Sequence, residues 1–295
     1  MNGLRHLYSG KVRDLYEVDE HHMLMVASDR LSAFDVVMHE TIPHKGRVLT
    51  ALTDYWLTSM PDVPRALISC DPRVIDTYVA GFLECSEWHG RTMLVRRAEM
   101  LPLECIVRAR LAGQAFDEYQ VSGTVHGMKA PVGMSLTDPF PEPWFTPSTK
   151  AATGHDVNIS REAAVAIVGS EIVDHIEAFC GALFQRAASA MSAVGLVLAD
   201  TKFEVGVIDG QLVVCDEVIT PDSSRIWPRD GVAPGVTPPS FDKQPFRDWL
   251  ASQTWDRTPP PPPVPGEIVQ TTSERYVAAY ERVTGLSLDA WYGNE

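Results

Sequence analysis

Hydrophobic and polar residues alternate along the first third of the chain, the pattern expected of half-buried β-strands. Five segments predict strands: Arg5–Ser9, Val12–Val18, Met23–Ala27, Ala66–Ser69 and Thr92–Arg96. The polar turn at 19–22 separates two of them, which favours an antiparallel connection. The first hundred residues are therefore expected to form a mainly antiparallel sheet with helices on one side.

Apolar residues recur at three- and four-residue spacing in other parts of the chain, which predicts helices. The segments with this spacing are Arg47–Met60, Phe116–Val121, the Ala-rich stretch Ser160–Ala193 and Ser273–Val283. The Ala-rich stretch is expected to form two helices broken near Gly169, with Ser160 as the N-cap residue of the first.

The remaining segments predict two strands, a long loop and a connector. Glu104–Leu111 and Leu196–Val218 have strand character, and the second is expected to turn at Asp209–Gly210. Lys129–Asn158 is rich in Pro and Gly and predicts a long loop, which in a globular protein is usually functional or disordered. Pro259–Pro263 predicts a stiff connector.

Length and composition are those of a globular protein with two parts. The chain has 295 residues, 45% of them hydrophobic, which is enough to build a sizeable core. Glu99–Pro102 is the expected junction, so the domains are predicted as 1–102 and 103–295. No apolar stretch approaches the ~20 residues of a membrane span, and the first ten residues do not resemble a secretory signal. These features predict a cytoplasmic protein without a membrane partner.

The net charge and the cysteines exclude further classes. The formal charge of −14 disfavours nucleic acid as a partner, because a phosphate backbone requires a basic face. The five cysteines are scattered and never spaced as CxxC, which argues against a disulfide framework or a zinc site. We expect them to be small buried apolar residues.

The first candidate site is the glycine turn Ser9-Gly10-Lys11-Val12-Arg13, which is expected to lie between two strands. Glycine permits a close backbone approach to phosphate, and Lys11 and Arg13 would neutralise it. The motif matches neither common phosphate-binding fingerprint, and by itself it is also consistent with an ordinary β-turn carrying exposed charges.

The second candidate site is acidic and lies in the predicted hairpin around Asp209–Gly210. Hard cations prefer carboxylate oxygens, so Glu204 and Asp216 are candidate magnesium ligands. A two-residue loop would pair Glu204 with Cys215 and turn Asp216 to the opposite face. A three-residue loop with a bulge would gather Lys202, Glu204 and Asp216 on one face. We predict the bulged hairpin because it sorts charged from apolar residues more cleanly. A solvated charged face is the alternative.

Three further clusters could bind anionic substrates. Ser224 and Arg225 follow Asp222 in a hydroxyl-rich loop suited to a phosphate, although the same residues are good turn formers. Arg108 shares a strand face with Arg110, where two cations would repel each other unless an anion lies between them. Lys150, His155 and Asp156 lie in the long loop, which could close over a substrate.

Seven sequence blocks occur in an order that resembles one family. They are SGKVRDLYEV, SDRLSAFD, PLECIVRARLAG, TPSTKAATGHDVNIS, GLVLADTKFEVG, CDEVITPDSSRIW and FDKQPFRDWL. The chain is identified by this resemblance as a member of the phosphoribosylaminoimidazole-succinocarboxamide synthase, or SAICAR synthetase, family. It departs from the family pattern at Gly113-Gln114, where Gly-Ser is expected, and in the run Pro259–Pro263.

The resemblance implies an α+β fold with two lobes and ATP in the cleft between them. The N-terminal nucleotide lobe would be antiparallel and kinase-like, and the C-terminal lobe would be larger and α+β. The implied enzyme is an ATP-dependent ligase of purine biosynthesis. It phosphorylates the carboxylate of carboxyaminoimidazole ribonucleotide (CAIR), and the amine of L-aspartate then displaces phosphate from the acyl phosphate to give SAICAR, ADP and phosphate.

The resemblance also implies roles for residues of this sequence. Lys11, Arg13, Lys202 and Asp222 would be catalytic, with Asp156 or Asp222 as the proton acceptor for the amine. The nucleotide and Mg²⁺ would be held by Ser9, Gly10, Lys11, Val12, Arg13, Met100, Leu103, Glu204 and Asp216, the last two being the metal ligands. The other substrates would be held by Arg108, Lys150, His155, Asp156, Ser224, Arg225, Lys243 and Arg247.

Two other functions are compatible with the same motifs. A small-molecule kinase would use the same cleft and metal but would not depend on aspartate. A nucleotide-binding regulator would bind ATP without releasing phosphate. The small-molecule partners are expected to be CAIR, L-aspartate and ATP, and the protein is expected to be a monomer or a small homo-oligomer.

Overall fold

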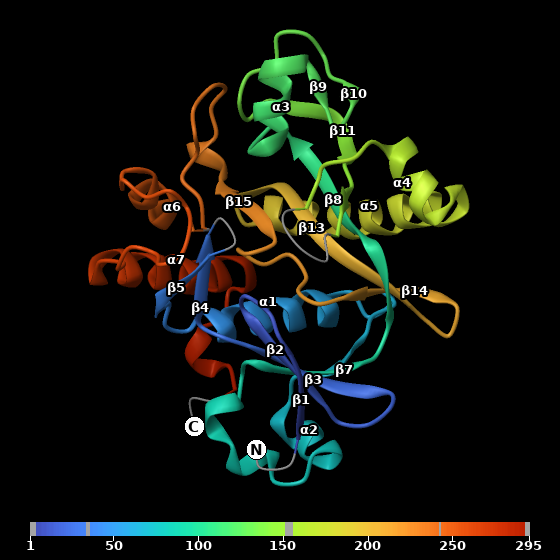
Figure 1. Cartoon of the computed structure of the whole chain (residues 1–295), viewed down its shortest axis with the longest axis vertical. Helices are drawn as coiled ribbons and strands as arrows, with labels where there is room; N and C mark the ends of the chain where they lie inside the picture. The colour runs from blue at the N-terminus through green and yellow to red at the C-terminus, as the bar shows by residue number, and fades with distance from the viewer. Residues whose placement is uncertain (1–3, 34–35, 151–155, 242, 293–295) are drawn as a thin grey trace. The chain divides into compact units, whose positions relative to one another are not determined.

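The computed structural model describes residues 4–33, 36–150, 156–241 and 243–292 of the chain. These residues form two compact units, which are described separately (Figure 1). Unit 1 comprises residues 1–98, 220–222 and 241–295, and unit 2 comprises residues 99–219 and 223–240.

Unit 1 is built on an antiparallel sheet. Its elements are β1 (Arg5–Ser9), β2 (Arg13–Glu17), β3 (His22–Ala27), β4 (Arg30–Ala33), β5 (Val36–Thr41), α1 (Lys45–Ser59), β6 (Leu67–Ser69), α2 (Pro72–Tyr78), β7 (Thr92–Arg96), α6 (Gln244–Ala251) and α7 (Gly266–Thr284). The main sheet has the order β1-β2-β3-β7-β6, and β4 pairs with β5 apart from it. All five strands predicted in this region and the helix near Arg47–Met60 are confirmed, with ends that differ by a few residues.

The C-terminal segment of the chain belongs to unit 1. Phe246 and Leu250 of α6 are fully buried with Leu31 and Ile42, which follow β3 in the sequence. Burying these side chains together removes apolar surface from water, and this holds the two ends of the chain in one unit. The compact units therefore divide the chain differently from the expected 1–102 and 103–295, although one boundary does fall between Ala98 and Glu99.

Unit 2 is built around two long strands. Its elements are β8 (Glu99–Arg110), α3 (Gln114–Ser122), β9 (Thr124–Val125), β10 (Met128–Lys129), β11 (Pro139–Phe145), β12 (Ser148–Thr149), α4 (Arg161–Val168), α5 (Ser170–Ala193), β13 (Leu196–Ile208), β14 (Gln211–Cys215) and β15 (Ser224–Pro228). β8 and β13 lie at the centre of an antiparallel sheet of order β11-β8-β13-β14. In addition, β12 pairs with β8 and β15 pairs with β13. The two helices predicted from the Ala-rich stretch are confirmed, and Ser160 caps the first through its side chain.

Alternation sorts the two central strands into an apolar face and a charged face. Phe203 and Val205 of β13 and Cys105 and Val107 of β8 are buried, and helix α5 packs along these strands (Figure 1). The thiol of Cys180 on α5 contacts that of Cys105, so this face is the core of unit 2. The residues between these positions therefore project from the other face of the sheet.

Glu99–Pro102, the expected junction, begins the twelve-residue strand β8, and unit 2 starts at Glu99. One expectation about unit 2 is wrong. Lys129–Asn158 is not one long loop, because β11 and β12 within it pair with β8. Proline donates no backbone hydrogen bond, so the sequence around Pro139, Pro141 and Pro143 does not suggest a strand. Such a segment is tolerated here because β11 is the edge strand of the sheet.

The predicted register of the β13–β14 hairpin is also wrong. Glu204 pairs with Cys215 and Ile208 with Gln211, so the loop is the two-residue turn Asp209–Gly210. Both turn residues have positive φ, 53° and 77°, the mirror-image turn whose twist matches that of the strands. Aspartate tolerates this conformation, so no bulge is needed.

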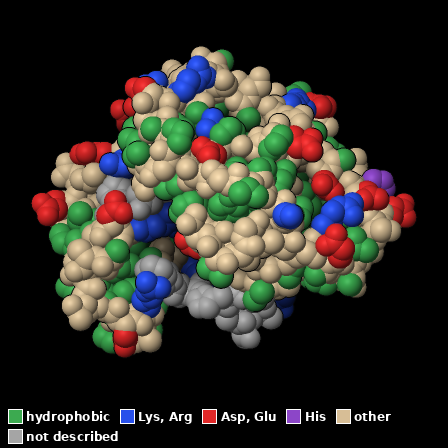
Figure 2. Space-filling model, turned by 90° about the horizontal axis from the view of Figure 1, so that it is seen from above, with side chains coloured by type: hydrophobic (Ala, Val, Ile, Leu, Met, Phe, Trp, Pro, Cys, Tyr) green, Lys and Arg blue, Asp and Glu red, His purple; other side chains and the backbone are tan. Residues whose placement is uncertain are grey.

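The remaining features concern the surface and the cysteines. Four cysteines are buried as expected, whereas Cys85 is only half-buried. Acidic and basic side chains are scattered over the face of the molecule shown in Figure 2. Among the described helices, none combines the length and the apolar character that crossing a bilayer requires.

Candidate functional site

The charged face of unit 2 carries two arginines on one aspartate. Asp200 of β13 lies opposite Arg108 of β8 and opposite Arg225 of β15, so the three residues form a row across the sheet. The Nη1 atoms of both arginines lie 2.5 Å from Oδ2 of Asp200. Arg225 is thus a second cation close to Arg108, with Asp200 between them, whereas Arg110 donates to the carbonyl of Thr137.

This row has one positive charge in excess. Arg108 is almost fully buried, which lowers its pKa, while Asp200 opposes that shift. The Arg108 Nε also donates to Oγ1 of Thr146, at 3.1 Å. The side chain of Arg225 is 28% exposed, so its guanidinium is the accessible part of the row. A partly accessible guanidinium is suited to binding a carboxylate or a phosphate.

Gly113 gives the Arg225 side chain its space. A Cβ atom placed on Gly113 would lie 2.0 Å from Nη2 of Arg225, and the backbone there has φ 57° and ψ −141°. The backbone angles require glycine at this position, and a side chain there would also displace the Arg225 guanidinium. Gln114, the residue that departs from the family pattern, follows at the first position of α3 and is exposed.

Two glutamates face each other beside this row. Glu104 of β8 pairs with Glu204 of β13, and like charges directly opposite each other destabilise a sheet. Two lysines compensate: Lys202 lies 2.6 Å from Glu104, and Lys150 forms an ion pair with Glu204. Burial is the largest influence on Glu104 and raises its pKa, and Asp156 and Glu204 add to this increase.

These carboxylates match the chemistry of a magnesium site. Mg²⁺ prefers oxygen ligands and commonly uses one or two carboxylates together with substrate phosphates. Glu104 and Glu204 supply carboxylate oxygens on adjacent strands, and these are the kind of ligand that fits the ion. Within the described residues, no three His, Cys, Asp or Glu side chains form a metal-binding cluster.

Asp216 directly follows β14. The register that we predicted, which would have put Asp216 on the same face as Glu204, is not the one observed. Asp216 has a left-handed backbone, with φ 54°, so strand alternation does not determine where its side chain points. Burial raises the pKa of Cys215 to about 12, and Glu204 and Asp216 both contribute to that increase. Glu204 and Asp216 are therefore both close to this thiol.

The segment Thr146–Lys150 borders the same face. Ser148 pairs with Glu104 and Thr149 with Leu103, which brings Lys150 to Glu204.

Ser224, at the start of β15, is buried, and its Oγ lies 2.7 Å from Oγ1 of Thr201. Of the two residues expected near a nucleotide base, Leu103 is buried and Met100 is 39% exposed.

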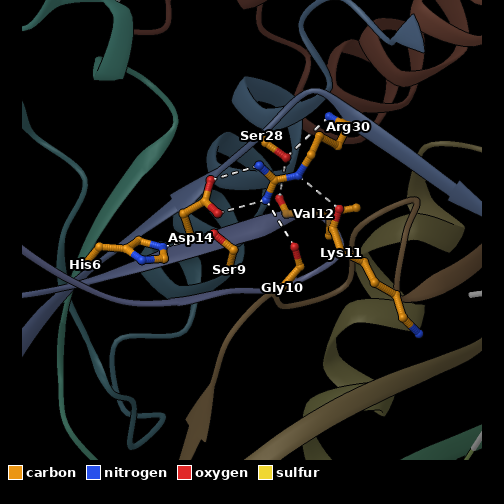
Figure 3. A network of polar contacts seen from close by, with 8 residues as sticks. All are labelled: His6, Ser9, Gly10, Lys11, Val12, Asp14, Ser28 and Arg30. Carbon is orange, nitrogen blue, oxygen red and sulfur yellow. Dashed lines mark hydrogen bonds and ion pairs between the residues drawn. The ribbon is translucent and has the colours of Figure 1, made fainter. Parts of the chain in front are cut away.

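The glycine turn lies in unit 1 between β1 and β2 and is held by Arg30 of β4 (Figure 3). The guanidinium of Arg30 binds both carboxylate oxygens of Asp14 at 3.0 Å, and it donates to the carbonyls of Gly10 and Lys11. Burial opposes the ionisation of Asp14, but the hydrogen bonds from Arg30 and Ser9 lower its pKa. The turn is therefore pre-formed.

Other contacts complete the glycine turn. Ser28 donates through its Oγ to the carbonyl of Val12, and the Oγ of Ser9 lies 2.9 Å from Nε2 of His6. The Lys11 side chain extends away from this network and is exposed (Figure 3). This geometry leaves an ammonium group accessible on a rigid backbone.

Unit 1 also contains a buried ionic cluster centred on Asp222. Lys45 Nζ lies 2.7 Å from Oδ2 of Asp222 and Lys243 Nζ lies 3.3 Å from Oδ1, to which the hydroxyl of Tyr276 also donates. The Lys45 side chain is fully buried. Burial alone would raise the pKa of Asp222, but Lys243 and Lys45 hold it far below its usual value. A carboxylate of this kind is a weak base, which argues against its expected role as proton acceptor.

The predicted site residues thus fall into two groups. Those in unit 1 are Ser9, Gly10, Lys11, Val12, Arg13, Asp222, Lys243 and Arg247, of which Arg247 is exposed on α6. Those in unit 2 are Met100, Leu103, Arg108, Lys150, Asp156, Lys202, Glu204, Asp216, Ser224 and Arg225. His155 lies outside the described residues.

Sequence reasoning missed the partners of these residues. No role was predicted for five residues that hold Arg225, Lys202, Asp222 and the glycine turn: Asp200, Glu104, Lys45, Tyr276 and Arg30. Alternation could have identified Asp200 and Glu104, which occupy the same strand faces as Glu204 and Arg108. Nothing local in the sequence indicates Lys45 or Arg30, because their partners are distant in the chain.

Known proteins resemble the whole chain. The sequence model described as SAICAR synthetase matches residues 6–262. The phosphoribosylaminoimidazole-succinocarboxamide synthase of Saccharopolyspora erythraea is 48% identical over 291 residues, which cover 96% of this chain and 95% of that protein. The enzyme of the same name from Chromobacterium violaceum is 45% identical over 288 residues, covering 97% and 100%.

A solved structure resembles the described fold. It is the SAICAR synthase of Saccharomyces cerevisiae in complex with SAICAR, with a TM-score of 0.88 and 37% sequence identity, covering 97% of each chain. This likeness extends over both compact units, and it confirms the expected mixture of helices and antiparallel sheets.

Proposed function

Because the chain belongs to the SAICAR synthetase family, we propose that it joins L-aspartate to CAIR at the expense of ATP, giving SAICAR, ADP and phosphate. The observation that carries this proposal is the family match over residues 6–262, together with 48% identity to a synthase that the chain covers almost completely. The contacts in each unit support it, since they provide cationic groups for phosphates and carboxylates.

The reaction needs an activated carboxylate. A carboxylate is a poor electrophile because its leaving group would be oxide, so the γ-phosphoryl group of ATP is first transferred to the CAIR carboxylate. Phosphoryl transfer depends mainly on positioning and charge neutralisation. Lys11 and Arg13 are proposed to neutralise the nucleotide phosphates, and the rigid turn beneath them supports that role.

The row Arg108–Asp200–Arg225 is proposed to bind the ribonucleotide through its phosphate or its carboxylate. Asp200 neutralises one arginine and fixes both, so an incoming anion meets a positioned guanidinium on Arg225. Ser224, which precedes Arg225 in the chain, supplies a hydroxyl nearby, and Thr201 fixes its orientation. Lys243 and Arg247, proposed earlier for substrate binding, belong to unit 1, where Lys243 already pairs with Asp222.

Glu204 and Asp216, with Glu104, are proposed to hold Mg²⁺. When bound, the ion supplies positive charge to phosphate oxygens. Lys202 and Lys150 would keep these carboxylates ionised, because each ammonium favours the charged form of its partner. The two ammonium groups also weaken the repulsion between Glu104 and Glu204.

The aspartate amine must lose a proton before it attacks the acyl phosphate. Asp156 is the remaining candidate acceptor once Asp222 is disfavoured, and it lies close enough to Glu104 to raise the pKa of that carboxyl. The amine then displaces phosphate, and an amide bond forms between the former CAIR carboxyl carbon and the aspartate nitrogen.

Phosphate release from ATP tests the proposed function directly. We expect phosphate release only when ATP, Mg²⁺, CAIR and L-aspartate are all present, with one SAICAR formed per phosphate. Each substrate is omitted in turn. Phosphate transfer to a hydroxyl compound without any need for aspartate would instead identify a small-molecule kinase. ATP binding without phosphate release in the complete mixture would identify a nucleotide-binding regulator.

A further inference from the structure

A buried histidine holds the backbone of the segment that carries Lys150. His126 lies in the turn between β9 and β10, and its side chain is buried, with only 2% of the residue exposed. Its Nδ1 atom is 2.8 Å from the carbonyl oxygen of Pro147. A carbonyl can only accept, so Nδ1 carries the hydrogen and the tautomer is determined.

The turn that presents His126 is itself fixed from α3. His126 and Gly127 have φ 49° and 75°, a mirror-image turn between the paired residues Val125 and Met128. The Glu118 carboxylate accepts hydrogen bonds from the backbone N–H groups of His126 and Gly127, at 2.9 and 3.1 Å. The hydroxyl of Thr124 donates to the same carboxylate at 2.8 Å. The imidazole is therefore held by an anchored turn.

The carbonyl that His126 contacts closes the base of the segment. The Pro147 carbonyl also accepts from the backbone N–H of Ile159, at 3.1 Å, so both of its lone pairs are used. Ser148 then bridges to Asn158, and the Thr149 N–H donates to the carbonyl of Val157 at 2.9 Å. The residue after Thr149 is Lys150, the ion-pair partner of Glu204.

We propose that His126 is a positioning residue for the reaction: it fixes the backbone of Thr146–Lys150 through Pro147, and thereby holds Lys150 on Glu204. Thr146, which precedes Pro147, also anchors this segment to β8: its hydroxyl accepts from Arg108 and its N–H donates to the carbonyl of Ile106. The Nδ1 atom of His126 contacts the backbone of this segment, so we expect its effect on the reaction to pass through the segment. The inference rests on the proposed function only for its kinetic readout.

Two substitutions at His126 separate its hydrogen bond from its backbone conformation. Asparagine and glycine both tolerate the left-handed backbone, but only asparagine keeps an N–H donor near the position of Nδ1. We expect H126G to lower kcat about 10-fold, the order expected for one buried hydrogen bond, and H126N to stay within about 2-fold of the native enzyme. If H126N loses as much activity as H126G, the donor has no role and the proposal is overturned.

A double-mutant cycle with Lys150 tests the path. If His126 acts through Lys150, H126G should lower kcat less than about 2-fold when K150A is already present. A general structural defect would lower kcat by the same factor in both backgrounds, and that result would contradict the proposal. H89A is the matched control, because the His89 ring also contacts a backbone carbonyl, that of Phe82 at 3.2 Å, in unit 1. When H89A replaces H126G in the cycle, it should change kcat by the same factor with and without K150A.

Hydrogen exchange gives a readout that does not depend on catalysis. The amides of Thr149 and Ile159 should exchange faster in H126G than in H126N, while the amide of Val173 in α5 should be unaffected. If the native protein makes no SAICAR, the proposed function fails, and these amides alone decide whether His126 anchors the segment. Equal protection in both variants would overturn the inference even in an active enzyme.

Discussion

Asp222 shows how the surroundings of a single residue change its chemistry. In the sequence it is an acidic residue in a polar loop, which suits a general base. In the structure its side chain is 5% exposed and contacts two ammonium groups and a tyrosine hydroxyl. The carboxylate is so well stabilised that accepting a proton would be unfavourable, and a structural role follows.

Neutralising Asp222 should therefore destabilise unit 1. In D222N two buried ammonium groups lose their counter-charge, and breaking a buried pair in this way typically costs about 3–5 kcal/mol of unfolding free energy. Chemical denaturation measures the loss. E20Q is the matched control, because Glu20 is highly exposed and should contribute almost nothing. A D222N protein as stable as the native one would contradict the account of the cluster.

The same residue predicts a dependence of stability on pH. The pKa of Asp222 is depressed in the folded protein, so below about pH 4 the unfolded chain binds a proton that the folded chain does not. Its contribution is therefore complete above the unfolded pKa and is lost as the pH falls towards the folded pKa. Between pH 5 and pH 3 the unfolding free energy of D222N should fall less steeply than that of the native protein. Parallel curves would refute this assignment.

At the scale of elements, helix α3 connects a backbone requirement to substrate binding. Gly113 and Gly123 flank its two ends with φ 57° and 70°, but only Gly113 contacts Arg225. G123A should lose about 1 kcal/mol of unfolding free energy, because alanine is strained in the left-handed helical region. G113A should lose more, because its backbone angles lie outside that region and the added Cβ must displace the guanidinium.

The kinetic difference between these two variants carries the prediction. We expect G113A to raise the KM for CAIR at least about 10-fold, the loss of one charge-assisted contact, while G123A leaves that KM unchanged. Steady-state kinetics on both proteins measure this. A similar KM in the two variants would show that Arg225 is not part of the CAIR site.

The elements also show what a sequence can reveal. The five predicted strands of unit 1 and the paired helices after Ser160 were identifiable because each buries one face and repeats with the period of its structure. β11 was not identifiable, since its three prolines suggest a loop until β8 is known to lie beside it. The β13–β14 register depended on whether the turn had two or three residues. Asp209 and Gly210 are compatible with both, so the sequence did not decide between them.

The candidate site was predicted unevenly for a related reason. Lys11, Glu204 and Arg225 stood out because charged residues beside a glycine, in a hairpin or in a hydroxyl-rich loop are visible in a single chain. Their partners Arg30, Lys150 and Asp200 are between 19 and 54 residues away, so only the folded chain joins them. The predicted division at residue 102 missed that Phe246 and Leu31 share a core for the same reason.

At the scale of the whole molecule, the proposed function assigns roles to residues of each compact unit. K11A in unit 1 should lower kcat/KM about 100- to 1,000-fold, as expected when one charge-stabilising contact is removed. R225A in unit 2 should lower the same constant by a comparable factor. Denaturation curves should show that both variants remain folded.

The control for this pair is K129A, because Lys129 of β10 is also an exposed lysine but lies outside both groups of candidate residues. It should retain native kcat/KM. If K11A retained native turnover, Lys11 would have no role in phosphoryl transfer and unit 1 would need another cation for it.

The most direct test follows an oxygen atom through the reaction. With CAIR labelled by ¹⁸O in its carboxylate, activation by phosphoryl transfer makes one carboxylate oxygen the bridge to phosphorus, and aspartate attack leaves that oxygen on phosphate. We predict that each phosphate released with SAICAR carries one ¹⁸O, measured by mass spectrometry. Unlabelled phosphate, released while SAICAR forms, would contradict the acyl-phosphate route and the account built on it.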